Sequence, residues 1–248
     1  MKAMNQSKVA VALTVYNRAD LIKETFEGLR KQTLARFYVY LCYDGSTDNI
    51  LEVVQDYADL NIVLCPYSET TSVGSAKNKA VTEALKNNHQ YIQILDSDDI
   101  PQPEMLEENS KRLDQGDVDW VVCWSHTFGA NSGTVRSQIK SLEEQCNKNY
   151  LHSWVMAKKE VFEKENFRLD LNGIDDWDWS IRVYKAGFKG AIVEKELHLY
   201  RIHPGRVSET TGSISLFPEL RKKVRIMNGI SDIDVTKSNP EKGDLYAF

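Results

Sequence analysis

Short apolar runs alternate with amphipathic segments over the first hundred residues of the chain. Four runs rich in β-branched, aromatic and other apolar residues predict buried strands at Lys8–Tyr16, Phe37–Tyr43, Asn61–Cys65 and Tyr91–Leu95. Between them, apolar side chains recur at helical spacing, and Asp20 is the expected N-cap of the first helix. This β-α-β-α-β-α-β order predicts a parallel sheet with helices on both faces.

The second half of the chain has a less regular pattern. It predicts helices at Pro103–Leu113, Lys158–Lys164, Asp175–Ala186 and Leu216–Ile226, and strands at Val118–Trp124, Ser153–Ala157, Lys189–Val193 and Leu197–Ile202, with a loop or hairpin over Gly129–Ser137. Asp178 and Arg182 are four residues apart on one predicted helix, which is typical of a surface ion pair. The last twenty or so residues are polar and predict no clear element.

Length and composition narrow the class of protein. With 248 residues and 42% hydrophobic residues, the chain can form one large domain with a real core. The net charge of −5 gives no general attraction to nucleic acid, and no apolar stretch approaches the roughly 20 residues of a membrane span. The N-terminus lacks the organisation of a signal peptide, so a cytoplasmic location is expected. Four widely separated cysteines predict buried free thiols, at Cys42, Cys65, Cys123 and Cys146.

The stretch Tyr91–Asp99 carries the first sign of chemistry. Its apolar run stops abruptly at three carboxylates, Asp96, Asp98 and Asp99. Parallel strands bind ligands at their carboxyl ends, and hard divalent cations prefer clustered carboxylates, so one interpretation is a cation site. The other is a solvated turn in which Asp99 is the N-cap of a helix with Pro101 in its first turn. This stretch alone does not decide between them.

Unusual residues also follow the other predicted strands. Tyr16 and Asn17 follow the first strand, Asp44 ends the second, and Lys77 lies after the third. Because parallel strands end at one edge, these side chains and the acidic loop are expected to face one crevice. That set suits a nucleoside diphosphate: the ring packs on the base, Asp44 accepts a base N–H, and Lys77 with a divalent ion neutralises the phosphates. The glycine-rich phosphate loops of other nucleotide-binding folds are missing from the sequence.

Seven segments in order then resemble the family 2 glycosyltransferases, which have the GT-A fold. They are LTVYNR at Leu13–Arg18, KQT at Lys31–Thr33, YDGSTD at Tyr43–Asp48, GSAKNKA at Gly74–Ala80, DSDD at Asp96–Asp99, DDWDWSIRVYKAGFK at Asp175–Lys189 and YRIHPGRVS at Tyr200–Ser208. The resemblance implies an α/β fold with a Rossmann-like mixed sheet, mostly parallel and flanked by helices. It implies a glycosyltransferase domain over residues 1–210, with a nucleotide-sugar-binding half (1–115) and an acceptor-binding half (116–210). Residues 211–248 would form a C-terminal helix and a polar tail.

The resemblance also implies roles on the donor side. The residues that would bind the nucleotide sugar are Thr14, Tyr16, Asn17, Asp44, Lys77, Asp96, Ser97 and Asp98. Thr14, Tyr16 and Asp44 would hold the base, usually uracil. The family more often has two acids where this chain has Tyr43 and Asp44, and arginine where it has Lys77. The alternatives are a core position for Tyr16, a turn or cap for Asp44 and an exposed helix lysine for Lys77.

The same resemblance implies the metal ligands and the base. Asp96 and Asp98 are the family's DxD pair, and Asp98 with His203 would bind Mn²⁺ or Mg²⁺. His198 is an alternative ligand, and His203 is otherwise a loop histidine bonded to the backbone. Asp176 would be the general base that deprotonates the acceptor. Asp175 is the alternative base, and either acid could instead stabilise the start of a helix.

Aromatic faces pack on sugar rings, so Trp154 and Trp177 are candidates for the acceptor pocket, although Trp177 fits a core position equally well. The resulting hypothesis is a metal-dependent inverting hexosyl- or N-acetylhexosaminyl-transferase. Its expected donor is a UDP-sugar, and its expected acceptor a glycan or glycolipid in surface polysaccharide or glycoconjugate synthesis. The basic cluster Arg221–Arg225 suggests peripheral membrane contact or a solvated helix face. Alternatives are a non-catalytic sugar-nucleotide-binding or scaffold protein and a nucleotidyltransferase.

Overall fold

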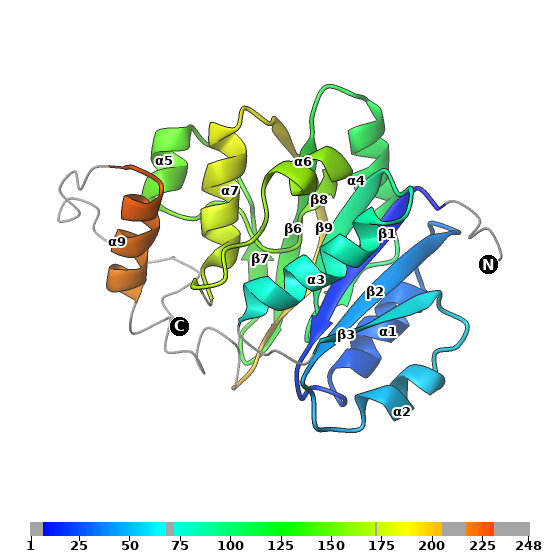
Figure 1. Ribbon diagram of the computed structural model, residues 1–248. Coiled ribbons are helices and arrows are strands. Elements are labelled where there is room, and N and C mark those ends of the chain that lie inside the picture. The colour runs from blue at the N-terminus through cyan, green and yellow to red at the C-terminus, as the bar shows by residue number, and fades with distance from the viewer. Residues whose placement is uncertain (1–6, 68–71, 172, 205–216, 231–248) are drawn as a thin grey trace.

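The computed structural model describes residues 7–67, 72–171, 173–204 and 217–230, which form a mixed sheet covered by helices on both faces (Figure 1). In chain order the elements are β1 (Val9–Val15), α1 (Ile22–Arg30), β2 (Phe37–Asp44), α2 (Ile50–Gln55), β3 (Ile62–Tyr67), α3 (Val73–Leu85), β4 (Tyr91–Asp96), β5 (Ile100–Pro101), α4 (Met105–Asp114), β6 (Trp120–Gly129), β7 (Gly133–Val135), α5 (Leu142–Asn147), β8 (Met156–Lys158), α6 (Lys159–Lys164), α7 (Asp175–Lys185), β9 (Gly190–Ile202) and α9 (Phe217–Met227).

The strands follow the order β3-β2-β1-β4-β8-β6-β9-β5, and β7 pairs with β6. The long ladders are parallel: β1 with β2 and β4, β2 with β3, and β6 with β9. The short ladders through β5, β7 and β8 are antiparallel. The predicted mixed α/β sheet is therefore confirmed. The parallel ladders among β1 to β4 are those that the first hundred residues predicted, and β6 with β9 adds a parallel ladder from the second half.

Strand β1 separates two layers of the core. Its valines and Leu13 point to the face covered by α1, α2 and α4, where Phe26 is fully buried. Ala10 and Ala12 point to the opposite face, where α3 packs with alanines such as Ala80. Small side chains on both partners let α3 approach the sheet closely, because backbone separation follows side-chain size. This close packing fixes the start of α3 relative to the strand ends.

Helix α1 begins differently from the prediction. Its N-cap position is Leu21, which makes no side-chain cap bond, and the side chain of Asp20 is almost fully exposed. The Ala19 N–H instead donates to Asp48 Oδ2 at 2.7 Å. The expectation that Asp20 caps this helix was wrong, because the loop after β2 supplies the carboxylate. The Ile22 and Glu24 N–H groups at the helix start donate to the Arg18 and Leu21 carbonyls.

The segment after the acidic loop also differs from one of the two interpretations. Ile100–Pro101 form β5 and pair with His198 and Leu199 of β9, and α4 begins only at Met105. Asp99 is therefore not a helix N-cap. The two predicted closing strands are one strand, β9, whose register with β6 shifts at Trp124 so that Glu194 and Lys195 form a bulge. The sequence pattern did not predict α5.

Helix α9 packs against α5 and α7 through a third small core around Trp177, Ile181 and Val224. Arg225 is 3% exposed and donates to the Cys146 carbonyl, and Lys223 pairs with Asp170. Two cations of the predicted basic cluster therefore take part in intramolecular contacts. The described part of the chain contains no helix long and apolar enough to cross a membrane. The tail beyond residue 230 lies outside the described residues, and the domain boundary near residue 210 stays a prediction.

The predicted surface pair on α7 is in fact buried. Asp178 is 0% exposed, and its carboxylate accepts from Arg168, Arg182 and Asn228, each at 2.8 Å. The prediction failed because the spacing identifies the pairing of Asp178 with Arg182 but not which side of the helix faces solvent. Asn228 follows α9, so this network ties α9 to α7. All four cysteines are free and buried, as predicted.

Candidate active site

Strands β1, β2 and β4 end at the same edge of the sheet. Thr14 lies opposite Cys42 on one side and Asp96 on the other, so the loops that follow these three strands emerge side by side. Thr14 is 8% exposed and forms part of the wall beneath those loops. The side chain of Asp44, at the end of β2, lies outside the described part, so its role toward a base stays a prediction.

The turn after β1 is shaped by Asn17, which has a positive φ of 49°. Asparagine adopts this left-handed conformation more readily than most residues. Its Oδ1 accepts from the Thr47 N–H at 2.8 Å, and its own N–H donates to Ser46 Oγ at 3.1 Å. Asn17 therefore joins the loop after β1 to the loop after β2. The turn leaves Tyr16 53% exposed, so Tyr16 is not a core residue.

The acidic loop after β4 is held on several sides. Thr25 Oγ1 on α1 contacts both the Ser97 carbonyl at 3.0 Å and the Asp99 carbonyl at 2.7 Å. The Arg201 side chain donates to the Asp98 carbonyl at 2.8 Å. Ser153 Oγ donates to Asp96 Oδ2 at 2.7 Å. The loop is thus fixed by α1, β9 and the segment before β8, and Ser97 contributes through its backbone.

Asp98 and His203 lie together, as the resemblance implied. His203 Nε2 is 3.1 Å from Asp98 Oδ2, and Arg18 Nη1 is 2.6 Å from the same oxygen. Burial opposes ionisation of Asp98, but the contact with His203 and the charge of Arg18 hold its pKa below the ordinary value. The carboxylate is therefore ionised at neutral pH and faces an imidazole and a guanidinium.

Asp98 and His203 are residue types that bind divalent cations. His203 Nδ1 is 2.8 Å from the Pro204 carbonyl, and Nε2 is the ring nitrogen that faces Asp98. Metal-bound histidines usually donate their second N–H in this way. Adjacent ligands on an octahedral ion with bonds of about 2.1 Å are about 3.0 Å apart, close to the observed separation. The described residues include no group of three or more His, Cys, Asp or Glu placed to hold a metal.

His198 is not placed as a second ligand of this kind. It is 0% exposed, and its ring stacks on Trp154 with centroids 4.2 Å apart. Burial lowers the pKa of His198 to about 3, while burial and the neighbouring carboxylates raise the pKa of Asp99 well above the ordinary value. His198 Nε2 lies 3.2 Å from Asp99 Oδ2. These two residues form a buried pair behind the acidic loop.

Lys77 and Asp175 form a buried ion pair. Their side chains are 3% and 5% exposed, and Lys77 Nζ is 2.8 Å from Asp175 Oδ2. Burial opposes the charged lysine, but Asp175, Asp96 and Asp176 together hold its pKa above the ordinary value. Lys77 is therefore not the exposed helix lysine of the alternative interpretation. Its ammonium group contacts a carboxylate at the start of α7.

Asp176, the adjacent acid, has a different environment. Its Oδ1 accepts from the Trp177 N–H at 2.8 Å, and its Oδ2 accepts from Asn149 at 3.2 Å. Burial and the charge of Asp175 raise the pKa of Asp176 to about 7, although Lys77 opposes that rise. A carboxyl with this pKa can take up and release a proton near neutral pH. The two adjacent acids thus have different partners: Asp175 pairs with Lys77, whereas Asp176 accepts only from uncharged N–H groups among these contacts.

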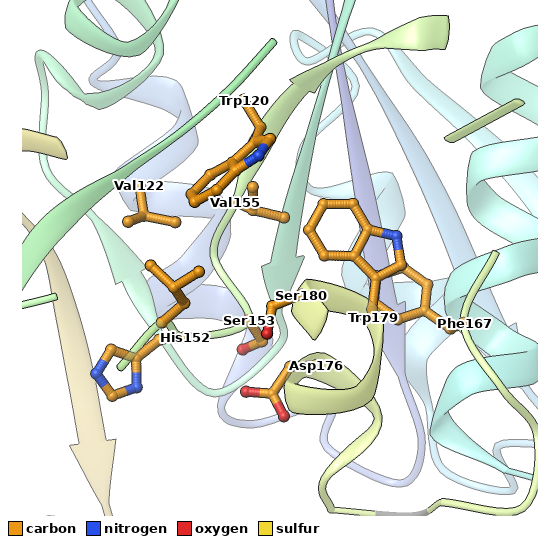
Figure 2. Close-up of a pocket in the computed structure, with 10 residues that line it drawn as sticks. Trp120, Val122, His152, Ser153, Val155, Phe167, Asp176, Trp179 and Ser180 are labelled. Atoms are coloured by element: carbon orange, nitrogen blue, oxygen red, sulfur yellow. The ribbon is translucent and has the colours of Figure 1, made fainter. Parts of the chain in front are cut away.

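Asp176 lines a narrow pocket whose other walls come from β6, the segment before β8, Phe167 and α7 (Figure 2). Trp120 and Trp179 form apolar walls, and Ser153 and Ser180 lie on the same side as the carboxylate in the view of Figure 2. The pocket is mainly apolar, which explains why ionisation of Asp176 is opposed.

The two tryptophans proposed for an acceptor pocket are both inside the protein. Trp154 is 2% exposed, donates to the Cys123 carbonyl at 3.1 Å and lies between the rings of His152 and His198. Trp177 is 1% exposed and donates to the Gln145 carbonyl at 2.6 Å. Neither indole offers an open face to a sugar ring. The core alternative given for Trp177 is the one that its placement supports.

Sequence reasoning assigned no role to several residues that contact the site. Arg18 lies within a motif, but its partner Asp98 is 80 residues away. Ser153 and Asn149 come from the irregular segment before β8 and bond Asp96 and Asp176. Thr25 lies on α1 and looks like any helix residue in the sequence. Only the position of Arg18, directly after Tyr16 and Asn17, gave a signal that could have been used.

Comparison with known proteins identifies the family. The model of Glycosyl transferase family 2 matches residues 10–185, which is more than half of the chain. The chain belongs to glycosyl transferase family 2. An uncharacterized glycosyltransferase of Methanocaldococcus jannaschii is 27% identical to this glycosyltransferase over 212 residues, which cover 80% of this chain and 72% of the relative.

Solved structures confirm the GT-A fold. The crystal structure of residues 1–349 of S. aureus TarS in complex with UDP-GlcNAc has a TM-score of 0.76 and 18% identity, covering 92% of this glycosyltransferase and 68% of that TarS fragment. A mannosyltransferase from Pyrobaculum calidifontis, in complex with GDP-Man and Mn²⁺, has a TM-score of 0.64 and 18% identity. That match covers 88% of this chain and 69% of the mannosyltransferase. The predicted family and fold are therefore both confirmed.

Proposed function

We propose that this chain is an inverting, metal-dependent glycosyltransferase that moves a sugar from a UDP-sugar to a hydroxyl group of a glycan or glycolipid. One observation carries the proposal: two differently tuned acidic centres flank Asp96. On one side, Asp98 and His203 lie 3.1 Å apart. On the other, Asp176 has a pKa near neutrality, and Asp96 is among the charges that act on it. The first centre suits a diphosphate with its cation, and the second suits a proton acceptor.

On the donor side, Tyr16 packs on the base and Asp44 accepts a base N–H. Asp96 and Asp98 face the ribose and the diphosphate. The mannosyltransferase complex contains Mn²⁺ with its nucleotide sugar, which supports a divalent cation here, with Asp98 and His203 as its proposed ligands. When bound, such an ion neutralises the charge that develops on the leaving diphosphate. The TarS complex contains UDP-GlcNAc, which supports a UDP-sugar as the donor class.

On the acceptor side, Asp176 is the base. The acceptor oxygen forms a bond to the anomeric carbon on the face opposite the diphosphate. At the same time, the bond to the diphosphate oxygen breaks and the acceptor proton passes to an Asp176 oxygen, which gives inversion. Asp175 is unsuited to this step because Lys77 occupies one of its oxygens at 2.8 Å. Asn149 orients Asp176 through its 3.2 Å contact.

We further place the reaction at the cytoplasmic side of a membrane, in surface polysaccharide or glycoconjugate synthesis. Helix α9 would make the peripheral membrane contact. Arg225 and Lys223 already have intramolecular partners, whereas Lys222 and Ile226 are exposed. Vesicle flotation with anionic lipid would test it, and the variant Lys222→Glu should reduce any binding that depends on charge.

The function is tested by incubating the protein with Mn²⁺ and a panel of UDP- and GDP-sugars, with release of the nucleoside diphosphate as the readout. Hydrolysis of one donor is expected, and Asp176→Asn should lower acceptor-dependent transfer by at least about 100-fold, as removal of a general base does. Asp20→Asn, at an exposed carboxylate, is the matched control and should retain full activity. Donor binding without turnover would favour the scaffold alternative, and full transfer by Asp176→Asn would reject the assigned base.

A further inference from the structure

Arg18 contacts Asp98, one of the two proposed metal ligands. Its Nη1 lies 2.6 Å from Asp98 Oδ2, the same oxygen that faces His203 Nε2 at 3.1 Å. The Arg18 and Asp98 side chains are only 17% and 12% exposed. A close, partly buried contact between a guanidinium and a carboxylate is a strong charge-assisted bond. In the described structure, Asp98 Oδ2 therefore already binds a cation of the protein itself, the Arg18 guanidinium.

The backbone directs Arg18 to this position. Asn17 has the left-handed φ of 49°, and its side chain is bonded to Thr47 at 2.8 Å. The Arg18 carbonyl accepts from the Ile22 N–H at 3.1 Å as α1 begins. Arg18 thus lies between a fixed turn and a helix start. Asp98 is equally fixed, because Arg201 holds its carbonyl at 2.8 Å.

We propose that Arg18 is a built-in counter-cation that competes with the divalent metal for Asp98 and makes metal binding dependent on the nucleotide. This inference rests on the proposed function, because it assumes that Asp98 and His203 bind the metal with a diphosphate. Two like charges on one carboxylate oxygen repel each other strongly where water is largely excluded. Arg18 must therefore leave Asp98 Oδ2 before that oxygen accepts a metal ion.

The nucleotide supplies the guanidinium with another partner. A diphosphate presents oxygens that suit the planar fork of arginine, so Arg18 can exchange a carboxylate for phosphate oxygens without losing a charged bond. Without a nucleotide, transfer of Asp98 to a metal breaks the charge-assisted bond between Arg18 and Asp98 at a cost in free energy. The expected consequence is positive coupling: metal and nucleoside diphosphate each strengthen the binding of the other.

The test is a titration of Mn²⁺ into the full chain, with and without UDP. The readout is the electron paramagnetic resonance signal of free Mn²⁺. Arg18→Gln should bind Mn²⁺ at least about fivefold more tightly than the wild type without UDP, the lower end of ordinary coupling between two sites. UDP should strengthen Mn²⁺ binding in the wild type by a larger factor than in Arg18→Gln. Arg18→Lys keeps the positive charge and should bind Mn²⁺ as weakly as the wild type.

Arg30→Gln is the matched control, because Arg30 pairs with Asp59 far from Asp98 and should leave Mn²⁺ affinity unchanged. Thermal unfolding of each variant checks that it is folded. Equal or weaker Mn²⁺ binding by folded Arg18→Gln would overturn the role of Arg18. The proposed function fails in a different way: wild type and Arg18→Gln would then both bind no Mn²⁺, even with UDP.

Discussion

The buried pair of Lys77 and Asp175 allows a prediction that connects stability with catalysis. The two side chains are 3% and 5% exposed and meet at 2.8 Å, so Lys77→Met would leave an uncompensated carboxylate inside the protein. Removing one partner of such a pair costs about 3–5 kcal/mol, and we expect that loss in the free energy of unfolding. The double variant Lys77→Met/Asp175→Asn should recover most of it, because no buried charge is left without a partner.

The same substitution should move the pH dependence of transfer. The pKa of Asp176 is raised to about 7 by burial and by Asp175, and the charge of Lys77 limits that rise. Without Lys77, the pKa of Asp176 moves higher. Because the base must be ionised, the acidic limb of kcat/KM should move to higher pH in Lys77→Met. Because the pKa of Lys77 is raised, its contribution to stability is present across the neutral range and is lost only in strong alkali.

Urea unfolding at neutral pH and a pH profile of donor turnover are the two measurements. Lys79→Met is the matched control: Lys79 lies on the same helix, but its pair with Glu83 is partly exposed and should contribute at most about 1 kcal/mol. If Lys77→Met is no less stable than Lys79→Met, or its acidic limb coincides with that of the wild type, the reasoning fails. If Lys77→Met mainly weakens UDP binding, Lys77 contacts phosphate instead.

Three further outcomes can be checked directly. The wild-type kcat/KM should rise with pH and level off above about 7, the pKa of Asp176, and a flat profile across the neutral range would contradict this. Gly190→Ala should lower the free energy of unfolding by about 1–3 kcal/mol in calorimetry, because its Cβ would lie 2.1 Å from the buried Trp120 ring. Gly133→Ala is the control, because its Cβ would meet only Thr127 Oγ1, at an ordinary contact distance of 3.8 Å. Tyr16→Ala should weaken UDP binding by about 1–3 kcal/mol, as loss of base stacking does, and an unchanged Kd would reject that contact.

The parallel half of the fold could be predicted because its signal is local. Each strand in the first hundred residues is a continuous apolar run, and each helix between them has a clear apolar face. The second half contains short ladders, such as Met156–Lys158 with β4 and Met156–Ala157 with β6, and two or three residues carry little periodicity. The charged side chains of the bulge at Glu194–Lys195 interrupt the apolar pattern, so the sequence predicted two strands where the structure has one, β9.

Only the site residues that lie inside recognisable motifs could be predicted from the sequence. The acidic loop, His203 and the two acids at the start of α7 lie in recognisable segments. Partners far apart in the sequence could not be read from it: Lys77 and Asp175 are 98 residues apart, and Arg18 and Asp98 are 80 apart. Burial was the other gap, because spacing placed Asp178 beside Arg182 without indicating that Asp178 is buried and also bonded to Arg168 and Asn228.

The bonds around the acidic loop have a thermodynamic consequence. Thr25 holds the carbonyls of Ser97 and Asp99, and Arg201 holds the carbonyl of Asp98, so the loop loses its conformational freedom when the chain folds. A ligand that meets this loop therefore has no ordering entropy of the loop to overcome. Differences in affinity among donors should arise from the side chains that exchange partners and from the sugar itself. The loop is thus a rigid part of the donor site and should have the same conformation with every donor.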